Sequence, residues 1–244
     1  MKIWMDEGFF FGLSVFETIG IENGQPLFLG EHLERMEESA KFFGIPFELS
    51  AEQVLEWLAG QRGEETADFR RHGALKIMLS QKNTLFLPRK NPYTARTYEK
   101  GFAADYSVIR RNETSPFVYR KTANYGECIL ENRACHQAGL DERIFLNTRG
   151  ELTEGTVSNL FFVRDGEVIT PALSCGLLPG IIRRRLLEKA YARETVIRPR
   201  DVEDCQECFV TNSLMGIMPV RRLGAFSFPG GPKTAELAVK AQIL

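Results

Sequence analysis

Apolar residues recur along this chain at spacings that separate helices from strands. In the first half, Leu33, Met36 and Ala40 are three and four residues apart, which predicts a helix over residues 30–44. Glycine and proline directly after this stretch end it. Ser50 and the Gln three residues later form a capping box, so a second helix is expected to begin there.

Strands are predicted where short apolar or β-branched runs lie between turn residues. Residues 1–28 are expected to form strands and turns, with an Asn23-Gly24 hairpin. The aromatic run Phe9–Phe11 is interpreted as part of a core or an interface rather than a ligand pocket. Further strands are expected at residues 74–79, 84–87, 103–109, 143–147, 157–163, 167–170, 208–211 and 217–220.

A polar segment with a proline, residues 110–116, is the predicted linker between two domains. The predicted division is 1–114, an α+β domain, and 119–244, a C-terminal domain that contains Lys121. Helices in the second domain are expected over residues 127–137, 180–190 and 232–244. The fold class is therefore α+β or α/β with two domains.

Composition is that of an ordinary soluble protein. The chain has 244 residues, 43% of them hydrophobic and 26% charged, with a net charge of −1. No overall positive charge attracts nucleic acid, and the run Arg183–Arg185 is interpreted as a solvated helix face. No apolar run is long enough to cross a bilayer, and the amino terminus does not resemble a signal peptide, so a cytoplasmic location is expected.

The five cysteines do not predict a disulfide framework, because their number is odd. Cys205 and Cys208 form a single CxxC motif, which is weak evidence for zinc or redox chemistry without a second pair. Cys128 and Cys135 lie seven residues apart on a predicted helix, so they are expected in the core. No metal site is predicted.

One lysine and one glutamate occur in a setting that suggests chemistry. Lys121 lies just before a predicted helix, in Lys-x-x-Asn-Tyr. Glu154 follows a strand and a turn, in Leu-Thr-Glu-Gly-Thr. Taken singly, a lysine before a helix is most often a solvated residue, and a glutamate beside glycine is most often part of a loop.

The order of the motifs resembles the class IV pyridoxal-phosphate enzymes of fold type IV. That family contains branched-chain aminotransferases, D-amino-acid aminotransferases and aminodeoxychorismate lyases. The resemblance is strongest from Lys121 to Val220. It is weaker in the first half, at Phe-Glu-Thr and at His-Leu-Glu-Arg-Met. The motifs that carry it are residues 121–125, 147–161, 179–183, 16–18 and 32–36.

The resemblance implies a role for each matching residue. Lys121 corresponds to the lysine that holds pyridoxal 5'-phosphate as a Schiff base and moves the proton on the substrate carbon. Glu154 corresponds to the carboxylate that keeps the pyridine nitrogen protonated, and Tyr125 to the tyrosine at the phenolate oxygen. The other matching cofactor positions are Arg35, Ser158, Asn159, Ile181, Ile182 and Ser213. Arg35, Ser213 and the helix start at 181–182 are expected at the phosphate. From its own segment alone, Arg35 is more simply a solvated partner of Glu31 or Glu38.

Substrate choice is expected to depend on Thr18 and Asn212. Residues 211–220 resemble the aminodeoxychorismate lyase version of this loop more than the transaminase version. Gly20 stands where many family members have arginine. If that arginine shapes the substrate end of the site, its absence bears on substrate choice for a lyase and for a transaminase alike. The leading hypothesis is a lyase that forms 4-aminobenzoate and pyruvate for folate synthesis. The alternative is an aminotransferase for branched-chain or D-amino acids, followed by a cofactor-binding or interaction protein without turnover. A homodimer that binds a small amino substrate is expected by resemblance.

Overall fold

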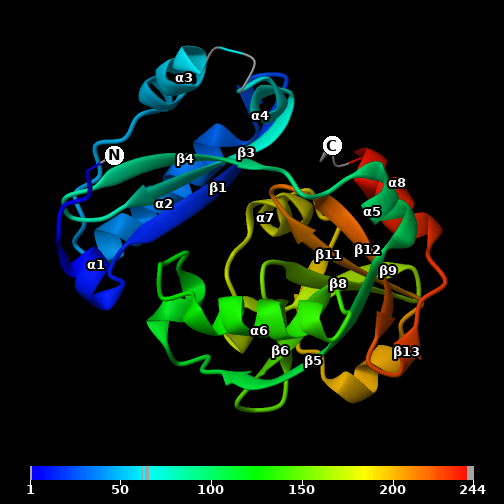
Figure 1. The fold of residues 1–244 in the computed structure, drawn as a ribbon. Coiled ribbons are helices and arrows are strands. Elements are labelled where there is room, and N and C mark those ends of the chain that lie inside the picture. The colour runs from blue at the N-terminus through cyan, green and yellow to red at the C-terminus, as the bar shows by residue number, and fades with distance from the viewer. Residues whose placement is uncertain (1, 62, 64–65, 241–244) are drawn as a thin grey trace. The chain divides into compact units, whose positions relative to one another are not determined.

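A computed structural model describes residues 2–61, 63 and 66–240, and the chain divides into two compact units (Figure 1). Unit 1 consists of Met1–Pro92 and Arg120–Tyr125, and unit 2 of Tyr93–Tyr119 and Gly126–Leu244. This division differs from the predicted one, because the third strand of the first half pairs with strands of unit 2 and the Lys121 segment joins unit 1.

Unit 1 is built on a four-stranded antiparallel sheet in the order β2-β1-β3-β4. The strands are β1 (Val15–Glu22), β2 (Gln25–Pro26), β3 (His72–Leu79) and β4 (Thr84–Lys90). The predicted β1–β2 hairpin is confirmed. Asn23 and Gly24 adopt left-handed φ values of 51° and 80°, which suit the Asn-Gly sequence of a tight hairpin turn.

The predicted helices of unit 1 pack their apolar stripes onto the sheet. They are α2 (Leu29–Phe42) and α3 (Ala51–Gly60), and the capping box at Ser50 is present. Their buried residues join one core with those of β1 and β3: Met36, Ala40, Val54, Leu58, Ile19, Ile21, Leu75 and Ile77. A short α4 (Ala67–Arg71) completes the unit.

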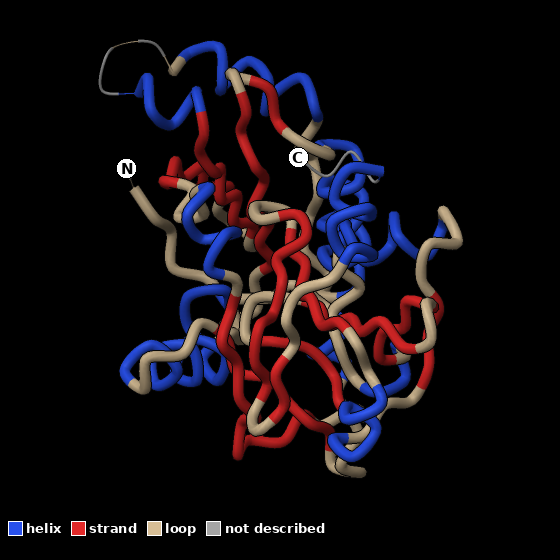
Figure 2. Tube along the Cα trace, turned by 90° about the vertical axis from the view of Figure 1, so that its right-hand side faces the viewer, coloured by secondary structure: helices blue, strands red, loops and turns tan. Residues whose placement is uncertain are grey.

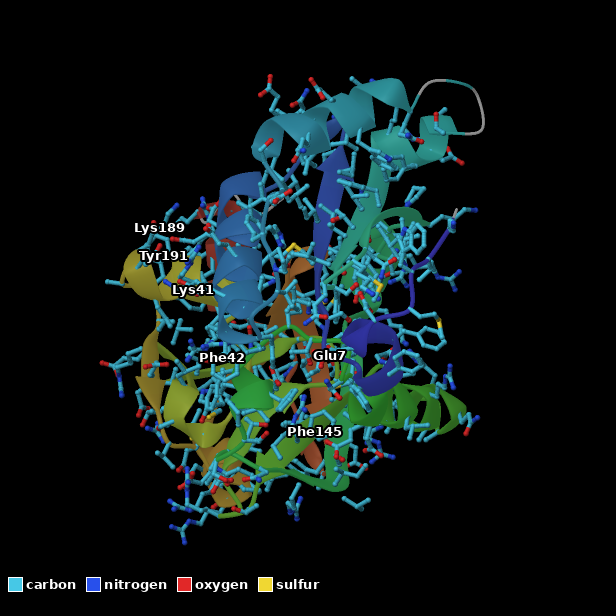
Figure 3. The ribbon with its side chains drawn as sticks, turned by 90° about the vertical axis from the view of Figure 1, so that its left-hand side faces the viewer. Glu7, Lys41, Phe42, Phe145, Lys189 and Tyr191 are labelled. Atoms are coloured by element: carbon cyan, nitrogen blue, oxygen red, sulfur yellow. The ribbon has the colours of Figure 1, made fainter. Side chains whose placement is uncertain are left out.

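The aromatic run near the amino terminus departs from the prediction of strands and a core. It forms α1 (Glu7–Phe11), whose start is visible at Glu7 in Figure 3. Phe9, Phe10 and Phe11 are each at least 60% exposed, so they are not part of a core, and their place in an interface stays a prediction. Asp6 caps the helix and also accepts hydrogen bonds from Ser80 and Lys82, which attaches α1 to the β3–β4 turn through polar contacts rather than apolar burial.

Six strands of unit 2 close into a ring. Their order is β8-β11-β12-β5-β6-β7, and β7 pairs with β8 at Glu154 and Asn159 (strands are red in Figure 2). They are β5 (Phe102–Arg111), β6 (Glu142–Asn147), β7 (Leu152–Gly155), β8 (Asn159–Arg164), β11 (Glu207–Asn212) and β12 (Gly216–Leu223). β9 (Glu167–Pro171), β10 (Arg193–Thr195) and β13 (Phe226–Ser227) extend the sheet.

Helices complete unit 2. The α-helices are α5 (Ala95–Lys100), α6 (Gly126–Gln137), α7 (Ile181–Glu188) and α8 (Pro232–Lys240), with 3-10 turns η2 (Pro116–Tyr119), η3 (Leu173–Cys175) and η4 (Pro199–Asp204). Cys128 and Cys135 of α6 are buried as predicted. The end of the predicted terminal helix, 241–244, lies outside the described residues. Over the described part of the chain, none of the helices has the length and apolarity to span a membrane.

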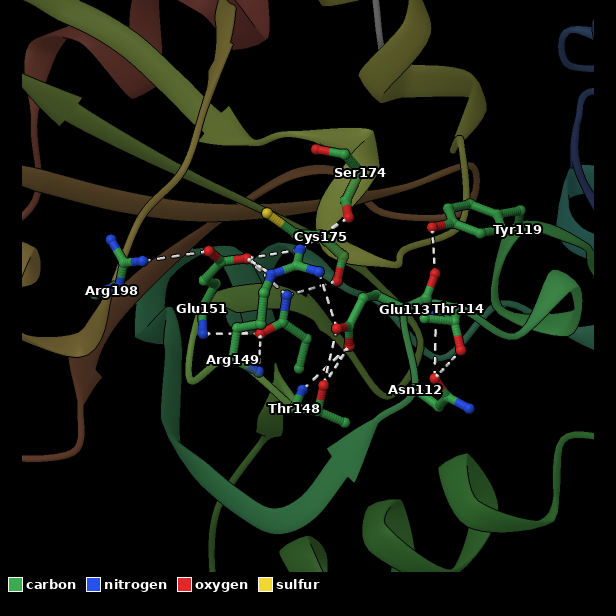
Figure 4. Close-up of polar contacts among 11 residues, drawn as sticks. Asn112, Glu113, Thr114, Tyr119, Thr148, Arg149, Glu151, Ser174, Cys175 and Arg198 are labelled. Atoms are coloured by element: carbon green, nitrogen blue, oxygen red, sulfur yellow. Dashed lines mark hydrogen bonds and ion pairs between the residues drawn. The ribbon is translucent and has the colours of Figure 1, made fainter.

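A charged network attaches the predicted linker to the β6–β7 turn (Figure 4). The Glu113 carboxylate accepts hydrogen bonds from Thr148 and, at 2.9 Å, from Nη1 of Arg149. Arg149 also pairs with Glu151, which in turn pairs with Arg198. The linker is therefore an ordered part of unit 2.

Candidate active site

Lys121 lies against the start of β1 within unit 1. The carbonyl oxygen of Lys121 accepts a hydrogen bond of 2.9 Å from the Phe16 N–H, and Thr122 forms a bridge with Val15. The lysine Nζ is 4.8 Å from the centre of the Phe16 ring and 5.5 Å from that of Tyr125. The two rings meet edge to face. Lys121 and Tyr125, predicted to act together, are thus neighbours around one phenylalanine.

Arg35 is not the solvated residue that its own segment favours. It is 7% exposed and forms a two-point ion pair with Glu17 of β1. The distances are 2.7 Å from Nε to Oε1 and 2.6 Å from Nη2 to Oε2. Because alternate residues of a strand face opposite sides, Glu17 faces α2 while Phe16 faces the other side. Packing of α2 against β1 brings residues 17 and 35 together.

His32 completes this buried charged cluster. Its Nδ1 lies 2.6 Å from Oε2 of Glu17. Burial raises the pKa of the Glu17 carboxyl, but the charge of Arg35 and the hydrogen bonds from His32 and Arg35 outweigh it and hold that pKa well below the usual range. Burial lowers the pKa of His32, with smaller opposing effects from Glu17 and a further lowering from Arg35 and Lys121. An ionised carboxylate only accepts hydrogen bonds, so Nδ1 of a neutral His32 is the donor.

Thr18 faces the same side of the sheet as Phe16. It pairs in register with Lys76 of β3, whose Nζ is 4.4 Å from the centre of the Phe16 ring. Burial, followed by the nearby charge of Arg89, lowers the pKa of Lys76. Lys76 is not among the site residues predicted from the sequence motifs, because the side that it faces follows only from the register of β3 with β1. Gly20 is buried opposite Ala74 on this same side.

Glu154 lies where the ring of unit 2 closes, and it is 6% exposed. Its Oε1 accepts a hydrogen bond of 3.1 Å from Nη2 of Arg111, and its Oε2 accepts one of 3.1 Å from the Leu178 N–H. Arg111 also donates to the Cys128 sulfur and lies over the Phe145 ring. The carboxylate is thereby oriented by Arg111, which lies in the predicted linker and was not among the predicted site residues.

The start of α7 fits closely against Asn159. The Asn159 amide donates a hydrogen bond of 2.9 Å to the Leu178 carbonyl. A Cβ on Gly180 would lie 2.0 Å from Oδ1 of Asn159, so this position requires glycine for space. Gly180 is the N-cap and supplies no capping side chain, so the first N–H groups of α7, at Ile181 and Ile182, have no side-chain cap. Helix N-termini of this kind bind anions.

Ser158 serves the loop itself. Its hydroxyl donates a hydrogen bond of 2.6 Å to the buried Glu142 carboxylate, which also accepts from the N–H and hydroxyl of Thr156. A Cβ on Gly155 would meet both Ser158 and Glu142. Glu142 therefore shapes residues 155–158, a role that the sequence pattern does not reveal because its partners lie 14 to 16 residues away.

Asn212 holds the loop between β11 and β12. Its Oδ1 accepts hydrogen bonds of 2.9 Å from the N–H groups of both Leu214 and Met215. Its Nδ2 donates to the Val157 carbonyl at 3.2 Å. The predicted phosphate residue Ser213 is half-buried in the same loop. The side chain of Asn212, predicted at the substrate, is thus engaged with the backbone of unit 2.

The CxxC cysteines and Arg183 lie in buried surroundings that favour a role in the fold rather than in catalysis. Cys205 and Cys208 are buried, and burial raises their thiol pKa values, to about 11 for Cys205 and further for Cys208. Such thiols are unreactive. No group of three or more metal-ligating side chains occurs within the described ranges. The solvated-face interpretation is wrong for Arg183, which is buried and donates to the Pro171 carbonyl and to Glu194.

Comparison with known proteins identifies the family. The model of amino-transferase class IV matches residues 14–223, and the chain belongs to this family of enzymes. A Thermotoga maritima protein named "Probable branched-chain-amino-acid aminotransferase" is 29% identical over 92% of this chain and 83% of its own. The aminodeoxychorismate lyase of Bacillus subtilis is 26% identical over 98% of this chain and 86% of its own. The crystal structure of 4-amino-4-deoxychorismate lyase from Pseudomonas aeruginosa matches with a TM-score of 0.84 at 26% identity, over 99% of this chain and 95% of that one.

Proposed function

We propose that this enzyme is a pyridoxal-phosphate-dependent 4-amino-4-deoxychorismate lyase. The donor set suits the cofactor: an amine for its aldehyde, a buried carboxylate for its pyridine nitrogen, and an arginine with a helix N-terminus for its phosphate. Lys121, Glu154, Arg35 and the start of α7 supply these groups. The uncapped first N–H groups of α7 support the assignment, because they are donors that a phosphate can use.

When bound, the cofactor withdraws the electrons that remain after a bond at the amino-bearing carbon breaks. Lys121 would hold the cofactor through its Nζ and would move the proton of that carbon. Glu154, held by Arg111, would stabilise a positive charge on the ring nitrogen. Tyr125, packed against Phe16, would donate a hydrogen bond to the cofactor.

The β11–β12 loop is the observation that carries the choice of a lyase. Asn212 accepts two backbone hydrogen bonds and donates a third, a combination that needs a side-chain amide. The transaminase version of this loop usually has small hydroxyl residues and Glu before the proline, whereas residues 214–218 of this chain are apolar or glycine. Lys76 adds support, because a cation beside Thr18 and Phe16 suits a substrate with a carboxylate distant from its amino group.

The reaction is balanced without a second substrate. The amino-bearing carbon loses a proton, and the C–O bond to the enolpyruvyl group breaks. That group gains a proton at its methylene carbon and leaves as pyruvate, while the ring becomes aromatic as 4-aminobenzoate. Lys121 is the proposed carrier of the proton.

The test is to supply aminodeoxychorismate to purified enzyme loaded with pyridoxal phosphate. We expect 4-aminobenzoate, followed by its fluorescence, and pyruvate, followed with lactate dehydrogenase, in equal amounts. Neither product should depend on added 2-oxoglutarate, and Lys121→Ala should form neither. Absence of both products from a correctly loaded enzyme would refute the lyase assignment.

The second candidate is an aminotransferase for branched-chain or D-amino acids, which the similarity to the Thermotoga maritima protein favours. The same preparation is mixed with a panel of L- and D-amino acids and 2-oxoglutarate or pyruvate. Transfer of the amino group at rates of about 1 s⁻¹ or more, with no aromatic product from aminodeoxychorismate, would establish this activity instead.

A further inference from the structure

The Glu17–Arg35 pair has a geometry that goes beyond neutralising a buried charge. The carboxylate engages Nε and Nη2, which form one edge of the guanidinium plane. Both the plane and the direction of the opposite edge, at Nη1, are therefore determined by Glu17. With 1% exposure for Glu17 and 7% for Arg35, neither group can rotate into water to change partners.

The strand that carries Glu17 also connects to the lysine segment. Phe16 donates its N–H to the Lys121 carbonyl and contacts Lys121 Nζ with its ring, while the next residue, Glu17, holds Arg35. His32 contacts the same carboxylate at 2.6 Å. Its second ring nitrogen, Nε2, is buried with no hydrogen-bond partner among the described residues. Polar groups of α2 and the Lys121 segment are thus joined through two successive residues of β1.

We infer that Glu17 is the positioning residue of a phosphate site: its carboxylate aims the outer edge of Arg35 at the phosphate of the cofactor. The inference rests on the proposed function. A guanidinium aimed in this way binds a phosphate oxygen without first losing side-chain freedom. Because Glu17 does not itself touch the phosphate, it acts only through Arg35.

The test compares binding of pyridoxal phosphate with binding of pyridoxal, which lacks the phosphate. Both are titrated into cofactor-free enzyme and followed by absorbance and by tryptophan fluorescence. Glu17→Gln keeps the shape of the side chain but removes its charge. We expect it to weaken the binding of pyridoxal phosphate by about tenfold or more and the binding of pyridoxal by less than about threefold. Glu17→Gln should add little to the effect of Arg35→Lys, because the two residues act as one unit.

Glu113→Gln is the matched control. It also removes a buried carboxylate that holds an arginine, but that arginine is Arg149 at the β6–β7 turn. It should leave the ratio of the two affinities unchanged. Should Glu17→Gln fail to fold, Glu17→Asp retracts the carboxylate while keeping its charge, and the same loss of phosphate preference is expected.

The outcomes separate the inference from the function on which it rests. Equal weakening of both ligands in the Glu17 variants would mean that Glu17 is only structural, and would overturn the inference. A full phosphate preference in Glu17→Gln would overturn it as well. If the wild-type enzyme binds neither ligand, the proposed function fails, and the inference fails with it.

Discussion

At the scale of single residues, Lys121 and Lys76 offer a direct comparison, because both approach the ring of Phe16. Only Lys121 is adjacent to Tyr125. Contact of the amine with the Phe16 ring is therefore common to both lysines. The covalent role proposed for Lys121 depends on the other residues of its segment.

Lys121→Ala is predicted to abolish covalent binding of pyridoxal phosphate. Wild-type enzyme should show an absorption band that borohydride makes permanent, with the reduced cofactor found on the peptide that contains Lys121. Lys76→Ala, the matched control, should retain the band and the labelled peptide. Labelling of Lys76 in the wild-type enzyme would contradict the assignment.

Glu17 should also make stability depend on pH. Its folded-state pKa lies well below the ordinary value of 4.5, so its contribution to stability is present above pH 4.5 and lost as pH falls. Below pH 4.5 the unfolded chain binds a proton that the folded chain does not. Urea unfolding at pH 5.0 and 3.5 should show that Glu17→Gln loses less stability than wild type, by roughly 1.4 kcal/mol per pH unit. An equal loss of stability in both proteins would show that the pKa of Glu17 is not lowered by folding.

At the scale of elements, the start of α7 depends on a contact that only glycine permits. The φ of Gly180 is −68°, a value open to any residue, so the requirement is space beside Asn159 rather than backbone strain. Because Gly180 has no Cβ, the N-terminus of α7 can lie close to Asn159 of strand β8.

Gly180→Ala is predicted to destabilise the enzyme by about 1–3 kcal/mol, because the added methyl overlaps the Asn159 amide. It should also weaken pyridoxal phosphate more than pyridoxal, since the helix start is displaced. Gly60→Ala is the control, because nothing lies within 4 Å of its Cβ position at the end of α3. Thermal unfolding and the two ligand titrations measure both effects. Unchanged stability in Gly180→Ala would show that the contact relaxes freely.

At the scale of the whole molecule, α1 and the residues just before it expose a run of large apolar side chains. Phe9, Phe10 and Phe11 are joined by exposed Trp4 and Met5 in the same segment. Asp6 holds this segment in place through polar contacts with Ser80 and Lys82, so the aromatic rings are presented rather than buried.

We predict a homodimer in which these rings are covered by the second copy. Light scattering should give twice the chain mass of 27.7 kDa. Phe9→Ser/Phe11→Ser should shift the mass toward that of one chain. Val108→Ser, an exposed and isolated apolar residue on β5, is the control and should remain dimeric. A wild-type monomer at micromolar concentration would contradict the prediction.

Much of the local structure follows from the sequence alone. The stripe through Met36 determines α2, the capping box at Ser50 starts α3, and Asn23-Gly24 turns the hairpin. These features depend on neighbours within a few residues, so they are readable along the chain. The motifs around Lys121 and Glu154 likewise identified the family, which the match over residues 14–223 confirmed.

Only the tertiary structure shows which side chains orient the predicted site residues. Arg111 orients Glu154 from 43 positions away, and Glu17 holds Arg35 from 18 positions away. Strand β5 joined the second unit because its partners, β6 and β12, lie far along the chain. The exposure of Phe9 depends on where its short helix is attached, which apolarity does not predict. Hydrophobic spacing encodes which face of an element is buried, whereas the partner that covers it is set by pairing across the chain.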